Sequence, residues 1–556
     1  MSKVGGNALI SVYDKSGIEK FAKGLADIGW NIYASGGTAK KIEDAGVVVT
    51  DVSELVGGDA ILGHRVVTLS REVYAGLLAD KTKPEDVEEL SRLQIPMIDL
   101  VCVDMYPLEE EIAKPGTTLA DITEKTDIGG PTMLRAAAKG RRIVLSVPEQ
   151  REQVLDWLQN GRPDEGVFLE ELAARAEYEV TRYTLPLAKY LGGKSVSGFI
   201  SKLHSPTKYG ENPQQAEAGF YADNRVDVDP LGIDQFKHVQ GMERSYINMT
   251  DIDRLLQTST HIAAGFERNF GKVPPMAVGV KHGNACGAGV GDTSVDAVKK
   301  MLEGDTRAIF GGVVMINGEI DKAVAETLMK HAMDGNMSRL LDGVIGSSVS
   351  DEALELLSRN KLRVVTNSAL GDLNEGSLDS GRRVRPVRGG VLEQPNYDFV
   401  QDLKAENMQQ YGELTDQQRQ DIILAWAIGS TSNSNTITLV KNGQLIGNGV
   451  GQQDRVGAGQ LAISRTTIEL PEIKEKVDEL ELIVKLDKLK LEGAVAYSDS
   501  FFPFPDGPEL LVKAGVRALL TSSGSVKDSD VVKTLTDAGA SIMMVPDKAG
   551  RGFYMH

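Results

Sequence analysis

A lysine and a histidine stand side by side at Lys281 and His282, where an apolar, strand-like segment breaks into glycine. A histidine in this setting can stay neutral and accept a proton near pH 7, which makes His282 a candidate general base. Lys281 could then stabilise negative charge that develops in a reaction. Lys-His pairs at strand ends are more commonly solvated and inert, so a catalytic role needs support from the rest of the chain.

Length and composition indicate a globular protein with several cores. The 556 residues exceed what one core organises, and 41% hydrophobic with 25% charged residues is ordinary for a soluble protein. No apolar run is long enough to span a bilayer, and the first residues lead directly into a strand-like segment, so we expect neither a signal peptide nor a membrane partner. The expected location is cytoplasmic.

Net charge restricts the classes of partner. With 61 Lys and Arg against 79 Asp and Glu, the formal charge is −18, which disfavours binding to nucleic acid or to an anionic membrane. An anionic substrate must therefore be held by local cations and backbone N–H groups. The two cysteines, Cys102 and Cys286, form neither a disulfide framework nor a paired metal motif, so we expect no metal site.

Residues 1 to about 195 alternate strand runs with helical runs, a pattern that predicts a parallel sheet wrapped by helices. Asp14 and Lys15 follow the first strand, and the turn at 35–38 follows the second. Loops after consecutive parallel strands meet at one sheet edge, so we expect these groups to lie together and to bind a phosphate. An ordinary capped turn remains the alternative for 35–38. Its four residues are Ser35, Gly36, Gly37 and Thr38.

Further polar groups follow later strand-like segments of this region. A buried-looking strand ends near Asp104 and Tyr106, and a glycine turn then enters an Ala-rich helix that places Arg135 and Lys139 on one face. This second glycine turn is again suited to an anion, although surface cations on a helix are the commoner explanation. The polar and charged residues here are Arg65, Thr68, Asp104, Tyr106, Asp127 and Lys139.

After a linker near 191–195, the chain returns to mixed strands and helices. Thr250 and Asp253 are predicted to cap a helix that runs through Ala264. A hairpin is predicted to turn at 442–443, and the glycines at 447–451 follow that hairpin rather than open a βαβ unit, which excludes a dinucleotide fingerprint. Residue identity does not show an internal duplication.

Taken in order, these motifs resemble the bifunctional purine-biosynthesis family that joins AICAR transformylase to IMP cyclohydrolase, over nearly the full length. The motifs that carry the resemblance are jointly specific, although each alone is weak. They are residues 35–38, 106–107, 127–130 with 135–139, 209–213, 281–282, 441–444 with 451–453, and 501–504.

The resemblance implies an α/β protein in three parts: a methylglyoxal-synthase-like, doubly wound parallel sheet at 1–195, and two cytidine-deaminase-like α/β subdomains at 196–370 and 371–556. It also implies an intertwined homodimer whose transformylase site forms across subunits. In zinc deaminases the metal sits on H-x-E and P-C-x-x-C elements. Here Gly283 and Asn284 follow His282, and Cys286 has no partner cysteine, so the resemblance implies no zinc.

For formyl transfer, the resemblance makes His282 the base that takes a proton from the AICAR amine, while Lys281 and Asn435 stabilise the developing charge. The co-substrate is 10-formyltetrahydrofolate, and no tightly bound cofactor is implied. The residues that would bind AICAR are Lys208, Tyr209, Gly311, Asp342, Asn435, Arg455 and Val456. Those expected near the folate and the C-terminus are Asp506, Ser525, Val526 and Arg551.

For ring closure of formyl-AICAR (FAICAR) to IMP, the resemblance makes Tyr106, Asp127 and Lys139 the groups that orient the carboxamide and move protons, with 35–38 on the phosphate. It also adds Val67 and Ile128 as binding positions. The sequence departs from the family pattern at three cyclohydrolase positions, where Val67 replaces a lysine, Asp104 an asparagine and Tyr13 a small hydroxyl residue. Losing a cation and adding a carboxylate both weaken an anion site. Lys208 replaces an arginine, which keeps the positive charge but loses the bidentate hydrogen bonding of a guanidinium group.

We therefore expect a dimeric enzyme that formylates AICAR and closes the product to IMP. One alternative is a transformylase whose first domain is inactive or only binds nucleotide. A second alternative is a non-catalytic nucleotide- or folate-binding protein. The Lys281, His282 and Asn435 set argues against the second.

Overall fold

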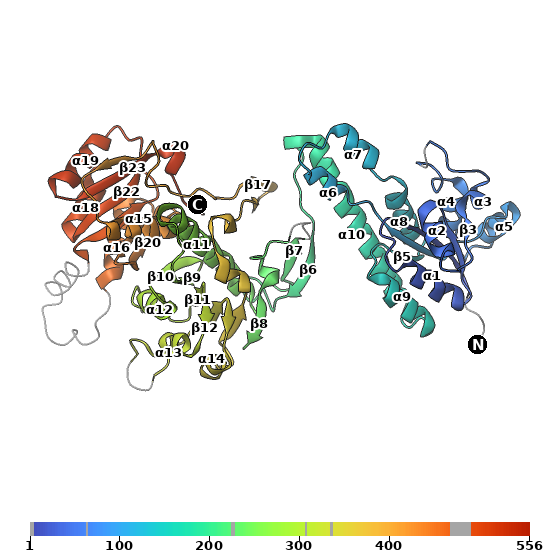
Figure 1. Cartoon of the computed structure of the whole chain (residues 1–556), viewed down its shortest axis with the longest axis horizontal. Coiled ribbons are helices and arrows are strands. Elements are labelled where there is room, and N and C mark those ends of the chain that lie inside the picture. The colour runs from blue at the N-terminus through green and yellow to red at the C-terminus, as the bar shows by residue number, and fades with distance from the viewer. Residues whose placement is uncertain are drawn as a thin grey trace. The chain divides into compact units, whose positions relative to one another are not determined.

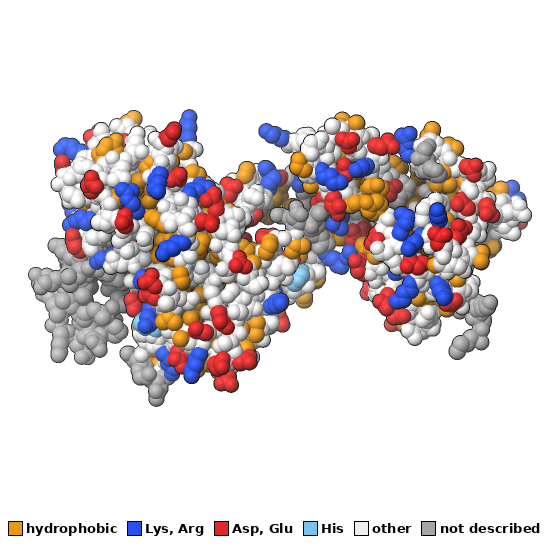
Figure 2. All heavy atoms as spheres, viewed as in Figure 1, with side chains coloured by type: hydrophobic (Ala, Val, Ile, Leu, Met, Phe, Trp, Pro, Cys, Tyr) orange, Lys and Arg blue, Asp and Glu red, His pale blue; other side chains and the backbone are white. Residues whose placement is uncertain are grey.

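The structure is a computed structural model that describes residues 5–62, 65–223, 228–305, 308–333, 337–467 and 491–555 (Figure 1). The chain divides into a smaller unit, mainly Met1–Lys202, and a larger unit formed by Leu203–Ala222 and Val228–His556. Within the described ranges, every helix is too short or too polar to span a lipid bilayer. On the face shown in Figure 2, acidic and basic side chains are interspersed over each unit.

The smaller unit contains one five-stranded sheet in the order β3-β2-β1-β4-β5. All four neighbouring pairs are parallel, as the alternation of strands and helices predicted. The order reverses between β1 and β4, and loops at such a switch point form a crevice beyond the carboxyl ends of the strands. The strands are β1 (Asn7–Val12), β2 (Asn31–Ala34), β3 (Thr50–Asp51), β4 (Leu100–Asp104) and β5 (Ile143–Leu145).

Helices surround this sheet, and the longest, α10, packs against α8, α6 and β5. Apolar side chains of the sheet and of the flanking helices form one core, which includes Leu9, Val101 and Leu134. The helices are α1 (Ile18–Asp27), α2 (Gly36–Glu43), α3 (Val52–Val56), α4 (Arg71–Leu78), α5 (Pro84–Leu93), α6 (Leu108–Ala113), α7 (Leu119–Lys125), α8 (Gly129–Lys139), α9 (Gln150–Gln159), α10 (Glu165–Gly192) and the 3-10 turn η1 (Gly193–Ser195). The glycine turns at 35–37 and 129–130 open α2 and α8, as predicted.

The larger unit is built on a mixed sheet of twelve described strands, in the order β18-β23-β22-β21-β19-β20-β10-β9-β11-β13-β15-β8. These strands are β8 (Lys237–Gln240), β9 (Met276–Lys281), β10 (Asn284–Val290), β11 (Val313–Ile316), β13 (Gly343–Gly346), β15 (Arg363–Thr366), β18 (Gln409–Tyr411), β19 (Ile437–Lys441), β20 (Gln444–Gly449), β21 (Ala494–Ser498), β22 (Val516–Ser523) and β23 (Ser541–Pro546). Three described strand pairs lie outside it: β6 (Ser201–Pro206) with β7 (Gly219–Asp223), β12 (Glu319–Ile320) with β14 (Ser348–Val349), and β16 (Arg382–Val387) with β17 (Gly390–Pro395).

Two buried helices, α11 and α15, pack against each other in the main core of this unit. The helix predicted from Thr250 begins earlier, because the reciprocal cap is formed by Ser245 and Asn248. The helices and 3-10 turns are α11 (Tyr246–Phe270), α12 (Ser294–Leu302), α13 (Lys322–Lys330), α14 (Asp351–Leu356), α15 (Asp416–Gly429), α16 (Arg455–Thr467), α18 (Asp506–Ala514), α19 (Asp528–Asp537), α20 (Asp547–Gly550), η2 (Ile233–Gln235), η3 (Ser368–Asp372) and η4 (Glu375–Ser377).

The larger unit repeats one order of elements: a buried helix, a hairpin, then helices alternating with strands. The first copy runs α11, β9, β10, α12, β11, α13, β13, α14, β15, and the second runs α15, β19, β20, α16, β21, α18, β22, α19, β23. The short β12 and β14 are additions to the first copy. The copies join where β10 pairs with β20. This structural repeat is the duplication that residue identity did not reveal.

Candidate active sites

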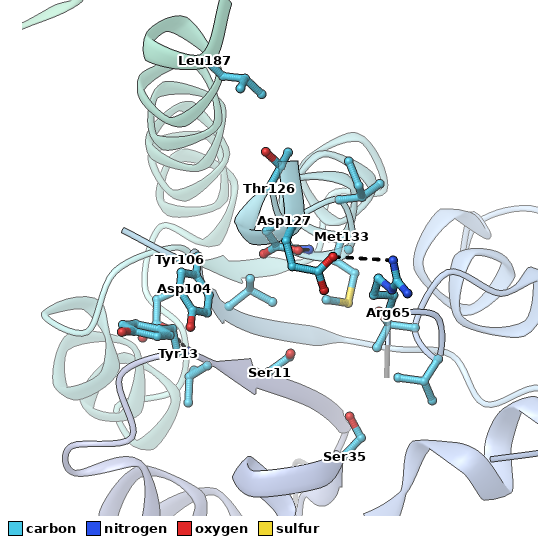
Figure 3. Close-up of a pocket in the computed structure, with 18 of the residues that line it drawn as sticks. Ser11, Tyr13, Ser35, Arg65, Asp104, Tyr106, Thr126, Asp127, Met133 and Leu187 are labelled. Carbon is cyan, nitrogen blue, oxygen red and sulfur yellow. Dashed lines mark hydrogen bonds and ion pairs between the residues drawn. The ribbon is translucent and has the colours of Figure 1, made fainter. Parts of the chain in front are cut away.

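The smaller unit has a cavity of about 780 Å³ at the switch between β1 and β4 (Figure 3). It is therefore located where the strand order places a binding crevice. Residues from both glycine turns and from the end of β4 contribute to its wall. The predicted site residues that line it are Lys15, Ser35, Arg65, Val67, Thr68, Asp104, Tyr106, Asp127 and Ile128.

The turn into α2 contributes Ser35 to the wall of this cavity. Ser35 is the N-cap of α2, and its hydroxyl makes no capping hydrogen bond. A Cβ atom built at Gly37 would lie 3.1 Å from Cε of Lys15, so the lysine lies against the start of the helix. Free backbone N–H groups of a helix N-terminus, a hydroxyl and an ammonium group together suit a phosphate.

Four predicted binding residues and Lys139 do not line this cavity. Asp14 accepts a hydrogen bond from Ser16 N at 2.9 Å, and Thr38 is buried, with its hydroxyl donating to Val12 O at 3.3 Å. Gly36 and Gly37 contribute backbone to the turn. Lys139 is exposed at the last residue of α8, whereas the cavity is reached by the first residues of that eleven-residue helix.

Asp127 and Tyr106 are the cavity's candidate proton-transfer groups. Asp127 accepts a hydrogen bond from Gly130 N at 3.0 Å, and its own backbone N–H donates to the Tyr183 hydroxyl at 2.6 Å. Burial raises the pKa of the Asp127 carboxyl, which moves it toward the range useful for acid-base catalysis. Tyr106 is half exposed and packs on Tyr13, with ring centroids 4.3 Å apart.

The cations among the cavity-lining residues are Lys15 and Arg65, and Val67 adds none. Arg65 forms an ion pair with Glu124 at 3.7 Å, and both side chains are about two-thirds exposed (66% and 70%). Exposed pairs of this kind contribute little to stability. Arg65 is therefore available to an anionic ligand, whereas the Asp104 carboxylate is engaged by Arg151 at 2.8 Å.

The larger unit has a cavity of about 400 Å³ that is lined by Lys281 and His282. The two residues lie at the end of β9, and the β9–β10 hairpin turns at His282 and Gly283, whose φ angles are 54° and 73°. Two successive positive φ angles are typical of a tight type I′ turn, which exposes the first turn residue. Lys281 Nζ donates to Phe310 O at 2.8 Å, so the ammonium group is held beside the turn.

Asp251 of α11 holds this turn from below, and sequence reasoning missed it. Its Oδ1 accepts a hydrogen bond from Gly283 N at 2.9 Å, and the residue is buried. Burial raises the pKa of Asp251, while the Gly283 hydrogen bond and the His282 charge oppose that rise. A usable signal was present in the sequence: Asp251 follows the Ser245 cap at the spacing at which Asp421 follows the Thr415 cap.

Gly311 and Asp342 lie at the same sheet edge as Lys281. A Cβ atom at Gly311, whose φ is 75°, would lie 4.0 Å from Lys281 Nζ. Asp342 directly precedes β13 and is near enough to Asp251 for its charge to raise the pKa of that carboxyl. The structure thus brings four predicted residues together: Lys281, His282, Gly311 and Asp342.

Asn435 is not among the residues that line this cavity, but its loop is bonded to the hairpin. Asn433 N donates to Asn284 Oδ1 at 3.3 Å. The buried Arg254, also missed from the sequence, donates to Thr431 O at 2.9 Å and to Asn433 Oδ1 at 3.2 Å. The Asn435 amide itself donates to Gln452 O at 2.9 Å. His282 and Asn435 therefore lie on two adjacent loops that are joined by hydrogen bonds.

A second polar cluster lies beyond Asn435 and contains Arg455. Arg455 pairs with the buried Asp499 at 3.2 Å, and Ser434 donates to the same carboxylate at 2.6 Å. Burial raises the pKa of Asp499, and the Ser434 hydrogen bond and Arg455 oppose that rise. Arg551 is held by Asp547. Val456 follows Arg455 in the first turn of α16.

The remaining predicted residues lie on loops or helix starts. Asp506 begins α18 and accepts from Gly507 N at 2.8 Å. Ser525 N donates to Asp528 at 3.2 Å, and Val526 is 97% exposed. Lys208, exposed, and Tyr209 lie between β6 and β7 and do not line the cavity of His282.

A metal centre is not evident in the part of the chain that the structure describes, where no group of three His, Cys, Asp or Glu side chains could hold an ion. Cys286 lines the cavity of His282, and burial raises the pKa of its thiol to about 12. A thiol with so high a pKa is a poor metal ligand.

Comparison with known proteins agrees with this geometry. Residues 137–465 match the model of the AICARFT/IMPCHase bienzyme, and residues 17–132 match the MGS-like domain. A bifunctional purine biosynthesis protein PurH of Staphylococcus carnosus is 34% identical over 96% of this chain and 98% of its own length. The PurH of Bacillus cytotoxicus is likewise 34% identical over 96% and 98%.

A crystal structure of ForH is 37% identical to this chain, covers 35% of it and all of the ForH chain, and superposes with a TM-score of 0.31. The family match covers more than half of the sequence, and the PurH relatives align from end to end. The chain therefore belongs to the AICARFT/IMPCHase bienzyme family and has an MGS-like N-terminal domain, as its motifs predicted.

Proposed function

We propose that this chain carries out two steps of purine biosynthesis: formyl transfer from 10-formyltetrahydrofolate to AICAR, and closure of FAICAR to IMP. Family membership over nearly the whole length supports this function. It does not favour a transformylase with an idle first domain or a non-catalytic binding protein. The observation that carries the proposal is the display of His282 beside Lys281 in the cavity of the larger unit.

In formyl transfer, the 5-amine of AICAR attacks the formyl carbon, a C–N bond forms, and the bond from that carbon to N10 of the folate breaks. His282 takes the proton that the amine loses, because the tight turn presents the imidazole to the cavity. Lys281 and Asn435 stabilise the oxyanion that forms at the formyl oxygen. The proton returns to N10 of the departing tetrahydrofolate.

The other transformylase residues keep their sequence-based assignments within this proposal. Gly311 and Asp342 support an AICAR site because they adjoin Lys281 and Asp251. Further AICAR contacts are assigned to Lys208, Tyr209, Arg455 and Val456, and folate or C-terminal contacts to Asp506, Ser525, Val526 and Arg551. A homodimer, in which a partner completes the site, is part of the proposal, and sedimentation of the purified protein tests it.

In ring closure, the carboxamide nitrogen attacks the formyl carbon and the formyl oxygen leaves as water. Asp127, with its raised pKa, and Tyr106 move the protons, while Lys15 and the 35–37 turn hold the phosphate. Lys139 stays a prediction, because the described geometry places it at the far end of α8. The division into domains 1–195, 196–370 and 371–556 and the cytoplasmic location are likewise proposed, and limited proteolysis and cell fractionation test them.

The deciding experiment measures the two reactions separately on wild type and on Val67→Lys. We expect wild type to formylate AICAR and to convert supplied FAICAR to IMP, with Val67→Lys closing the ring faster because it restores a cation to the cavity. Formyl transfer by Val67→Lys is the internal control, since Val67 lies in the other unit. Absence of ring closure in wild type would reduce the proposal to a transformylase with an inactive first domain.

A further inference from the structure

The loop that carries Lys15 joins β1 to α1 and is tied down by one buried cation, Arg151. Arg151 Nη1 donates to Ser16 O at 2.8 Å, and Nη2 donates to Asp14 O at 3.2 Å. Nη2 also contacts Asp104 Oδ2 at 2.8 Å. One guanidinium group therefore binds two carbonyls of the loop and the carboxylate at the end of β4.

Asp104 completes this arrangement from the opposite side. Its Oδ1 accepts hydrogen bonds from the backbone N–H groups of Tyr13 and Asp14, the latter at 3.2 Å. The two side chains of the ion pair are only 8% and 12% exposed. Figure 3 shows Asp104 and Tyr13 together at one side of the cavity. Arg151 and Asp104 together thus bind two carbonyls and two N–H groups of the loop at residues 13–16.

The position of Arg151 is energetically unfavourable for a cation, so we expect a compensating interaction there. It is the second residue of α9, where the helix dipole disfavours positive charge, and it is buried. Its Nε has no hydrogen-bond partner among the described residues. A buried cation in such a place needs a paired carboxylate, and Asp104 supplies it.

We propose that Arg151 is a positioning residue for the phosphate end of the FAICAR site, and that Asp104 and Arg151 act as one unit. The inference rests on the proposed ring closure. By fixing residues 13–16, the pair holds Lys15 against the start of α2. Arg151 also neutralises Asp104, so this carboxylate, which faces the cavity, does not repel an anionic substrate.

The test is a double-mutant cycle on the full-length enzyme with Arg151→Ala, Asp104→Asn and the double variant. Two quantities are measured: KM and kcat for closure of FAICAR, and the Kd for IMP by calorimetry. We expect Arg151→Ala to raise KM and Kd by roughly tenfold to a hundredfold, with a smaller change in kcat. The double variant should recover part of that loss, because the unpaired carboxylate is gone.

Two controls separate positioning from a general loss of structure. Arg92→Ala removes an exposed ion pair of the same unit, with Glu89 at 3.3 Å, and should leave both constants unchanged. A melting curve and limited proteolysis of each variant report whether the smaller unit, which contains Arg151, stays folded, and formyl transfer reports the larger unit. Arg151→Lys keeps the positive charge but loses the bidentate hydrogen bonding of the guanidinium group, so it should raise KM less than Arg151→Ala does.

Each outcome decides between the two claims. An unchanged KM and Kd in Arg151→Lys and in folded Arg151→Ala, or no recovery in the double variant, overturns the inference while leaving the proposed function intact. A wild type that binds IMP without closing FAICAR overturns the proposed ring closure, and the Kd series then decides the role of Arg151 by itself.

Discussion

The two hairpins of the larger unit, β9–β10 and β19–β20, have the same backbone and carry different chemistry. One turns through Lys281, His282 and Gly283, the other through Lys441, Asn442 and Gly443. The φ angles are 54° and 73° in the first turn and 53° and 73° in the second. The hairpins occupy equivalent places in the repeated order of elements, so each is a reference for the other.

The support beneath the two turns is also repeated. Asp251 accepts a hydrogen bond from Gly283 N, and Asp421 accepts hydrogen bonds from Gly443 N at 2.7 Å and Asn442 N at 2.8 Å. Both carboxyls are buried, and burial raises the pKa of each. The turn and its carboxylate are therefore a structural device. The first turn residue decides whether that device presents a base, and only the β9–β10 copy has His there.

The largest expected difference between the copies is catalytic. His282→Ala should lower kcat for formyl transfer by about 10²- to 10⁴-fold, because the general base is lost. Asn442→Ala, the matched change, should alter this rate by no more than about twofold, because Asn442 takes no part in the reaction. Steady-state kinetics with AICAR and 10-formyltetrahydrofolate provide the measurement. Equal losses in both variants would end the assignment of His282 as the base.

The second difference concerns the carboxylates. Asp251→Asn and Asp421→Asn should each destabilise the fold by about 1–3 kcal/mol, because an amide offers the turn one acceptor oxygen and an NH2 group where the carboxyl group offers two oxygens. Only Asp251→Asn should also lower kcat for formyl transfer, since it loosens the turn that presents His282. Denaturant unfolding and kinetics on the same samples separate the two effects. If Asp421→Asn lowered kcat as much as Asp251→Asn does, Asp251 would have no special role in catalysis.

A smaller effect is expected from the glycines. Gly283→Ala and Gly443→Ala each place a Cβ atom on a residue with φ of 73°, at a cost of about 1–2 kcal/mol. The Cβ atom at 443 would approach a backbone atom, Val290 O, at 2.9 Å, whereas the nearest atom to the one at 283 is the side-chain carbon Arg254 Cγ at 3.1 Å. Gly443→Ala should therefore have the lower melting temperature, and the reverse order would show that the two turns are not equivalent scaffolds.

The smallest expected effect is a pH dependence that the two copies share. Because the pKa of Asp421 is raised above its ordinary value of 3.8, the folded chain keeps this proton to a higher pH than the unfolded chain does. Stability from this group is complete below the unfolded value and is lost as pH rises through the folded value. The melting temperature of wild type minus that of Asp421→Asn should thus grow as pH falls from 7 to about 4. Asp251→Asn should give the same sign.

Local sequence patterns predicted much of the fold and part of each site. The glycine turns before α2 and α8, the hairpin at 442–443 and the parallel order of β1, β2 and β4 all depend on neighbours in the chain. The edge rule for parallel strands predicted that Lys15 and Ser35 lie together, and both line one cavity. These predictions succeeded because turn chemistry and strand polarity are short-range properties.

The remaining site residues could not be predicted from the sequence, because their roles depend on long-range contacts. Asp251 and Arg151 act through hydrogen bonds to loops that are distant in sequence, and their own neighbours show no sign of those partners. Lys139 shares a helix with the Gly129 turn, but the length of that helix separates them, so a shared motif did not mean a shared cavity. The start of α11 was misplaced because Thr250 resembles a cap as well as Ser245 does.

The junction between β10 and β20 limits how this protein can be divided. The strands meet where Gly289 pairs with Gln444, and Val290 N donates to Gly443 O at 2.9 Å, next to the second turn. Cutting the chain between the two copies would leave each with a long unpaired sheet edge, a template for aggregation. A gene encoding either copy alone should therefore yield insoluble protein, and the smallest truncation that still transfers formyl groups must retain both.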